Sequence, residues 1–201
     1  MPEPSQPLSE KESLQLITEM IGKAKSSFHS NGTSAILWGS VIFFCSIVTF
    51  LQLQFTTELP FDVWWLQWLA VVPQVIFIYR NRGNRKAVGY EETTMTYTWL
   101  AFAASVLLLM FYVSLYQPGH AASLYLLIFG IPTFITGGAC QFRPMLIGGL
   151  ICWILFLVSL HTPLKINMLL MALAALSAWL IPGLLLRKRY REAAQNTAHG
   201  V

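Results

Sequence analysis

Two carboxylates and two imidazoles stand in the short stretches between the apolar runs of this sequence. Glu58 and Asp62 share one such stretch, and His120 and His161 lie in two others. Carboxylate oxygens and imidazole nitrogens are ligands of divalent metals, so these four residues are candidates for a metal site. They show no HxxxH or ExxH spacing, and polar loop residues also occur together by chance. We therefore assign no catalytic residue and no cofactor.

The polar groups inside the apolar runs are few and uncharged. No Asp, Glu, Lys, Arg or His falls in the core of any run, although proton- or sodium-coupled transport normally needs such a group near mid-membrane. Gln74, next to Pro73, is the best candidate for a polar side chain that faces a cavity. The pattern argues against a coupled pump, a voltage sensor and an intramembrane protease.

Composition indicates a membrane protein. Hydrophobic residues make up 55% of the 201 residues and charged residues 11%, against about 25% charged in soluble domains. The net charge of +4 does not indicate a nucleic-acid partner, because the basic residues flank apolar runs and do not gather on a soluble face. Cys45, Cys140 and Cys152 have no CxxC spacing, so neither a disulfide framework nor a zinc site is expected.

Six apolar runs are long enough, or nearly so, to cross a bilayer core as helices, which takes about 20 residues. They cover residues 35–55, 63–79, 98–116, 121–140, 145–160 and 166–186. The predicted fold class is an all-α polytopic membrane protein with six transmembrane helices, in a membrane domain spanning 33–188. The first run is too long for the core of a signal peptide, so we expect it to remain as a helix.

Lys and Arg set the predicted threading. With the N-terminus inside, twelve of the 13 basic residues fall in cytoplasmic segments and only Lys165 falls in an outer loop, as the positive-inside rule requires. We expect both termini in the cytoplasm and a location in a bacterial inner membrane. The runs RNRGNRK at 80–86 and RKRYR at 187–191 form a basic rim that would attract anionic lipid or a protein partner.

The N-terminal segment 1–32 predicts an amphipathic helix on the inner leaflet. Ser9 and Glu12 have the spacing of a capping box. Apolar residues recur on one helical face: Leu14, Ile17, Ile21 and Phe28. Such a helix lies in the headgroup region, and packing against the ends of the bundle is the alternative. At the other end, 189–201 is expected to be a cytoplasmic tail, loose from residue 192 onwards.

The stretch GGACQFRPMLIGG at 137–149 predicts a tight helical hairpin. Antiparallel helices around its turn would bring the two Gly pairs to the same depth, and small residues let helices approach closely in lipid. The residues that carry this prediction are Gly137, Gly138, Arg143, Pro144, Gly148 and Gly149. Proline suits the first turn of the second helix. A phosphate-binding loop is the alternative, but such loops hold Gly inside the turn, and this turn is Gln-Phe-Arg-Pro.

Three of the six runs contain an internal proline: Pro73, Pro132 and Pro182. All three runs go from outside to inside in the predicted threading, and each proline removes a backbone hydrogen bond and can kink its helix. Kinked helices alternating with straight ones could frame a cavity or gate. The alternative is that proline is simply common in membrane helices. Trp153 and Trp179 lie deep in their runs and are expected to be packing residues.

The basic-capped amphipathic N-terminus, the LWG at 37–39 and the FITGGACQFRPMLIGG hairpin at 134–149 together resemble a set of small uncharacterised multi-pass inner-membrane proteins of Bacteroidota. The resemblance implies location and fold but no activity and no site residues. The function we expect is that of a non-enzymatic subunit or signalling accessory. A small permease or channel for an uncharged or lipid-like solute is the alternative, and a membrane enzyme acting on lipid is a second alternative.

Overall fold

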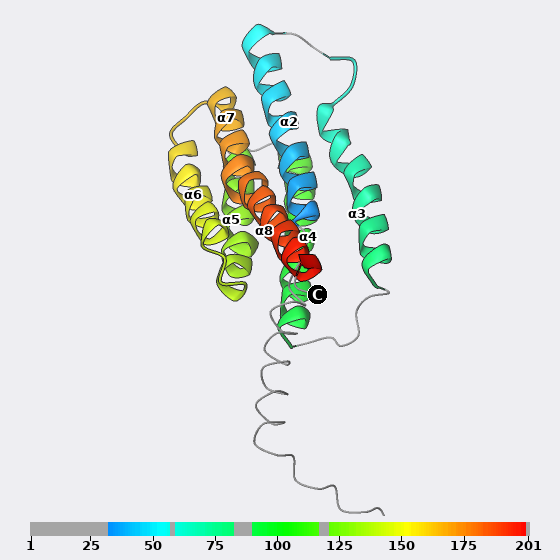
Figure 1. Ribbon diagram of the computed structural model, residues 1–201. Helices are drawn as coiled ribbons and strands as arrows, with labels where there is room; N and C mark the ends of the chain where they lie inside the picture. Colours follow the sequence, from blue (N-terminus) through cyan, green and yellow to red (C-terminus); the bar gives the residue numbers. More distant parts are fainter. Residues whose placement is uncertain (1–31, 57–58, 83–89, 117–120, 200–201) are drawn as a thin grey trace, which may run out of the picture.

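The computed structural model describes residues 32–56, 59–82, 90–116 and 121–199, and these ranges contain helices and turns but no strand (Figure 1). The elements in chain order are α2 (Thr33–Phe55), η1 (Val63–Trp65), α3 (Leu66–Arg82), α4 (Tyr90–Tyr116), α5 (Ala121–Ala139), α6 (Arg143–Ser159), α7 (Leu164–Ala175), η2 (Leu176–Leu180) and α8 (Ile181–His199). The predicted all-α class is confirmed. The amphipathic helix predicted within 1–32 lies outside the described residues.

Four helical stretches are long and apolar enough to cross a membrane: Thr33–Phe55, Thr94–Tyr116, Ala121–Ala139 and Leu164–Arg189. The last of them combines α7, η2 and most of α8 into one continuous helical rod. The helices α3 and α6 have 17 residues each, or about 26 Å of helix, slightly less than a hydrocarbon core of about 30 Å. The four long helices indicate a membrane protein.

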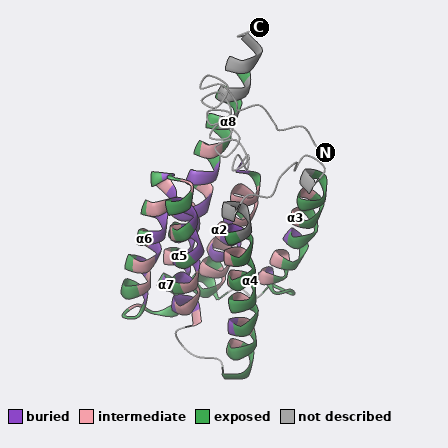
Figure 2. Ribbon diagram, turned by 90° about the horizontal axis from the view of Figure 1, so that it is seen from below, coloured by how far each residue is buried: buried purple, intermediate pink, exposed green. Residues whose placement is uncertain are grey.

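The packed centre of the molecule lies among α2, α5, α6 and the rod formed by α7, η2 and α8. Figure 2 shows the buried positions concentrated on these helices, whereas α3 and α4 are mostly exposed. The backbone of α4 packs against α5, and that of α3 packs against α2. The fold is therefore a tight bundle with two more loosely attached helices.

The helices α5 and α6 form the predicted antiparallel hairpin. Two nested hydrogen bonds close the end of α5. The Phe142 N–H donates to the Gly137 carbonyl (2.9 Å), and the Gln141 N–H donates to the Gly138 carbonyl (3.1 Å). This is a Schellman arrangement, with Gln141 in the left-handed conformation (φ +49°). Pro144 lies in the first turn of α6. The turn therefore consists of the C-cap of α5, followed directly by the first turn of α6 with its proline.

The predicted face-to-face contact between the two Gly pairs is wrong. A Cβ built on Gly137 would lie 2.5 Å from the backbone N of Leu146, and one on Gly149 would lie 2.9 Å from the backbone N of Phe134. A Cβ on Gly138 would find nothing nearer than 3.9 Å, while one on Gly148 would lie 2.6 Å from Cα of Ala178 in η2. Successive helical residues point about 100° apart, so only one member of each pair can face the partner helix.

The start of α2 also depends on glycine contacts that no pattern in the sequence indicates. Gly32 has φ +66° and precedes the first turn of α2 without a side-chain cap. A Cβ there would collide with the carbonyl oxygen of Gly183 on α8, and a Cβ on Gly39 would lie 3.0 Å from the backbone N of Leu180. These contacts hold α2 tightly against η2 and α8.

The helix α3 begins beside the middle of α2. The Cys45 thiol, near the centre of α2, donates to the Val63 carbonyl at 3.5 Å. Figure 1 agrees, since α2 extends well past the first turn of α3. Consequently α3 lines only the half of α2 that begins at Thr33.

The three proline-containing helices do not surround a common space in the described part of the chain. Pro132 and Pro182 are fully buried in the bundle, whereas Pro73 is exposed on α3, which packs against α2. The five residues before Ile181 form a π-helical turn, and Ile181 N–H donates to the Leu176 carbonyl. Because Pro182 has no N–H to donate, it cannot continue the α-helical ladder there.

The predicted loose tail is wrong for the described residues, because α8 continues as helix to His199. The middle of α8 contacts the hairpin. The Arg189 guanidinium lies 5.1 Å from the centre of the Phe142 ring, a cation–π distance. This contact links the end of the membrane rod to the α5–α6 turn.

Candidate functional site

Of the four candidate metal ligands, Asp62 and His161 are described, and Glu58 and His120 lie outside the described residues. Asp62 Oδ1 accepts a hydrogen bond from Trp64 N–H at 3.0 Å and so caps η1. His161 Nδ1 lies 3.3 Å from the Leu157 carbonyl oxygen at the end of α6. Among the residues that the structure describes, no three His, Cys, Asp or Glu side chains gather as a metal site would require.

Four aromatic rings fill the space between α4, α5 and η2. Phe129 lies 5.3 Å from Trp179 and 5.7 Å from Phe102, measured between ring centres. Trp99 and Phe102 of α4 lie 6.1 Å and 6.0 Å from Trp179, both edge-on. These are favourable separations and orientations for aromatic pairs. The packing role predicted for Trp179 is confirmed.

The Trp179 indole also makes a polar contact within this cluster. Its Nε1–H donates to Thr133 Oγ1 at 2.8 Å, and the Thr133 hydroxyl donates to the Phe129 carbonyl at 2.8 Å. Both polar groups are therefore satisfied although they are buried, which matters because an unpaired buried donor costs about 1–3 kcal/mol. The cluster is a structural core that ties α5 to the rod.

Five buried side-chain atoms have no hydrogen-bond partner among the described residues: Ser46 Oγ, Gln74 Oε1, Ser123 Oγ, Thr136 Oγ1 and Asn167 Nδ2. Native proteins rarely leave such atoms unpaired without a reason. Gln74 is the one of these five that lines the pocket described next. It is also the residue predicted from the sequence to be a cavity-facing polar group.

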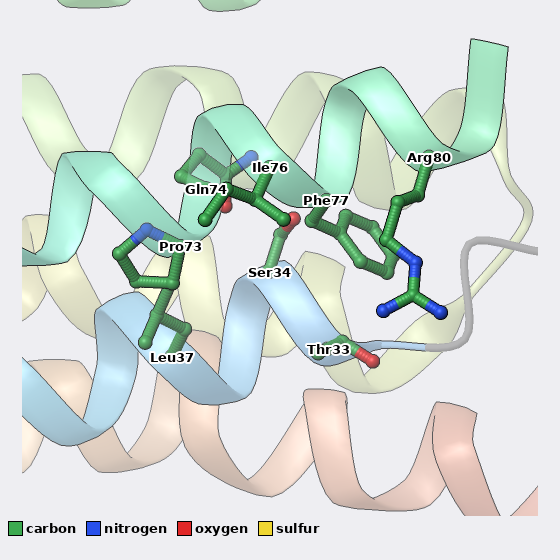
Figure 3. A pocket seen from close by; sticks show the side chains of 8 residues that line it. All are labelled: Thr33, Ser34, Leu37, Pro73, Gln74, Ile76, Phe77 and Arg80. Carbon is green, nitrogen blue, oxygen red and sulfur yellow. The ribbon is translucent and has the colours of Figure 1, made fainter.

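A pocket of about 250 Å³ lies between α2 and α3 (Figure 3). Its lining residues come from the first turns of α2 and from the second half of α3: Thr33, Ser34, Leu37, Pro73, Gln74, Ile76, Phe77 and Arg80. Most of this surface is apolar, and the pocket is open along one side. It lies in the half of α2 that α3 contacts.

The pocket is cationic at one end and mainly apolar elsewhere. Figure 3 shows Arg80 and Thr33 at one end and Pro73 and Leu37 at the other, with the apolar Phe77 and Ile76 and the polar Gln74 and Ser34 between them. Arg80 is exposed and forms no ion pair with a described carboxylate. The positive end of the α2 dipole points to the same place. A cationic end next to a mainly apolar lining suits an amphipathic anion.

The comparison of this chain with family models, curated proteins and solved structures gives no match. The resemblance to inner-membrane proteins of Bacteroidota therefore stays a prediction, and the function has to be inferred from the residues of the chain itself.

Proposed function

We propose that this chain is a six-span protein of a bacterial cytoplasmic membrane, with both termini in the cytoplasm, and that it acts as a non-enzymatic subunit that binds a transmembrane helix of a partner protein. The threading is supported by the distribution of Lys and Arg in the sequence. The two short helices, α3 and α6, complete the six spans, since a bilayer thins locally around helices that are too short for it.

The observation that carries the proposed function is the presence of two opposite seams on α4. The inner seam is buried or half-buried and faces the bundle: Met95, Trp99, Phe102, Val106, Leu109 and Val113. The outer seam is exposed throughout: Tyr97, Ala101, Ala104, Leu108, Phe111 and Leu115. Both follow the alternating spacing of three and four residues by which helices pack along their length. This spacing follows from helix geometry alone, so what characterises the outer seam is that the described residues leave it uncovered and that two of its six residues are alanine.

The residue sizes on the outer seam favour a helix as its occupant. Ala101 and Ala104 make a shallow centre between the larger Tyr97 and Leu108. Close helix approach in lipid relies on such small residues, because apolar side chains gain little from leaving a lipid environment for one another. A partner helix with one bulky residue opposite the two alanines would fit this profile.

The permease alternative is not favoured. The three proline helices frame no common space in the described ranges, and the centre of the bundle is occupied by the aromatic cluster around Trp179. The enzyme alternative would need converging carboxylate and imidazole groups, and Asp62 and His161 each have a local backbone contact. A helix-binding subunit needs only a surface, which α4 provides.

The threading predicts the sides of three reporter fusions. Fusions after Gly83 and after Val201 should report a cytoplasmic location, and one after Gly119 should report an external one, because positively charged loops are retained inside. Paired alkaline phosphatase and fluorescent-protein fusions would measure this. An external signal at Gly83 would contradict the six-span threading.

The partner-binding seam predicts the effect of enlarging its two alanines. The variant Ala101→Leu/Ala104→Leu should weaken the complex about tenfold or more, since overpacking typically costs 1–3 kcal/mol and about 1.4 kcal/mol corresponds to a factor of ten. Native gel electrophoresis of mildly solubilised membranes would follow the shift from complex to free protein.

The matched control is Ala103→Leu, which makes the same change on the same helix at an exposed position outside both seams. This variant should leave the complex intact. Wild-type protein that migrates at its own mass, or an equal loss with Ala103→Leu, would rule out the outer seam as the binding surface.

A further inference from the structure

We propose that the pocket between α2 and α3 binds one anionic glycerophospholipid. Its phosphate meets Arg80, its glycerol ester region meets Gln74 and Ser34, and one acyl chain lies on the apolar end of the pocket. The assignment of this lipid to the cytoplasmic leaflet rests on the threading proposed above.

The arrangement of charged, polar and apolar groups in the pocket carries this inference. A phospholipid joins a charged phosphate to hydrocarbon through ester carbonyls. The pocket has Arg80 at one end and the apolar Pro73 and Leu37 at the other, and Gln74 and Ser34 lie between them beside the apolar Ile76 and Phe77 (Figure 3). Arg80 lies six residues after Gln74 in α3, a rise of about 9 Å along the helix. The pocket therefore extends over the depth of a lipid headgroup and the first part of a chain.

The state of the polar groups also indicates a ligand. Gln74 Oε1 is buried without a hydrogen-bond partner among the described residues, so the protein itself does not fix the amide. Oε1 and an ester carbonyl are both acceptors, so the proposed contact requires the amide to rotate about its soft terminal torsion and donate an N–H group to the ester carbonyl. Arg80 has no described carboxylate beside it, and arginine binds phosphate oxygens through two parallel hydrogen bonds.

The size and shape of the pocket favour a lipid over a free anion. A volume of about 250 Å³ corresponds to roughly eight water molecules at about 30 Å³ each, which is more than a phosphate ion fills. The lining is largely apolar, with Leu37, Ile76 and Phe77 on its walls. Since the pocket is open along one side, the remainder of the lipid can stay in the bilayer.

Three ligands distinguish the contribution of the phosphate to binding from that of the acyl chains. Purified protein in a neutral detergent, stripped of lipid, would be titrated with phosphatidylglycerol, with diacylglycerol of the same chains, and with inorganic phosphate. Native mass spectrometry would count bound lipid and a melting shift would report affinity. We expect one phosphatidylglycerol per chain, diacylglycerol bound at least tenfold more weakly, and no displacement of lipid by inorganic phosphate.

Two variants test the two polar contacts. Arg80→Gln should lower the affinity for phosphatidylglycerol about tenfold, to that of diacylglycerol, because it removes the charged contact to phosphate. Gln74→Leu should weaken both lipids by the same factor of about five, the effect of one lost hydrogen bond. The control is Arg191→Gln, which removes the charge of an exposed arginine that does not line the pocket. It should not change the affinity for phosphatidylglycerol or for diacylglycerol.

The results that would overturn the lipid site differ from those that would overturn the six-span threading. Equal losses for Arg80→Gln and Arg191→Gln would show general surface attraction and no site. Equal affinity for phosphatidylglycerol and diacylglycerol, or displacement by inorganic phosphate, would exclude the lipid phosphate contact. Binding to purified protein does not depend on orientation or partner, so reversed reporter fusions would change only the leaflet that supplies the lipid.

Discussion

Replacing Gly137 with alanine is expected to destabilise the protein by about 1–3 kcal/mol, the usual range for overpacking. The added Cβ would lie 2.5 Å from the backbone N of Leu146 and 2.9 Å from the backbone carbon of Met145. Backbone atoms cannot rotate away as a flexible side chain can, so α5 and α6 would have to separate. The helix pair would then lose the close contact that stabilises it in lipid.

The neighbouring residue supplies the matched control. A Cβ on Gly138 would meet nothing nearer than 3.9 Å, so Gly138→Ala should be neutral or should stabilise the helix slightly, by up to about 1 kcal/mol. Thermal unfolding of the two variants in the same detergent would measure the difference. Equal melting temperatures would mean that the hairpin is not packed through Gly137.

Replacing Trp179 with alanine is expected to have the largest effect of any single substitution, about 3–5 kcal/mol. Trp179 is 5% exposed and its ring contacts those of Trp99, Phe102 and Phe129. Its removal leaves a cavity among three helices, and Thr133 loses the indole donor. The loss of packed contacts is costly in lipid as well as in water, since the atoms around a void lose their neighbours.

Trp65→Ala is the control for this substitution. It removes the same side chain from a site that is 69% exposed, where substitutions usually change stability by less than about 0.5 kcal/mol. Reversible unfolding in mixed micelles with increasing SDS would give both free energies. A Trp179→Ala protein as stable as Trp65→Ala would show that the aromatic cluster does not hold the bundle together.

Local rules predicted the helices well. The apolar runs coincide with helices because an unbroken run of such residues in lipid has to satisfy its backbone hydrogen bonds internally. The α5–α6 turn was also predictable, since Pro144 has a strong preference for the first turn of a helix and Arg143 interrupts the apolar run. The extension of α8 to His199 was missed, because its polar sequence does not show the apolar periodicity that the prediction used.

The candidate site was only partly predictable. Gln74 was selected because it is a rare polar residue inside an apolar run, and the structure places it in the pocket between α2 and α3. Arg80, Ser34 and Thr33 were not selected for this role, since they lie at helix ends where such residues are common. No spacing in the sequence indicates that α3 lies along the first half of α2, where the pocket is.

The sequence by itself determined the helical class, the membrane character and the position of the α5–α6 turn, because each depends on residues close together in the chain. Only the tertiary structure decided which glycine of each pair is a contact, that Trp179 joins α4 to α5, and where α3 lies along α2. The physical reason is that these features depend on the rotation and the sliding of whole helices against each other. Both are fixed by close contacts between residues far apart in sequence, such as the Cys45 thiol with the Val63 carbonyl and Gly148 with the backbone of Ala178.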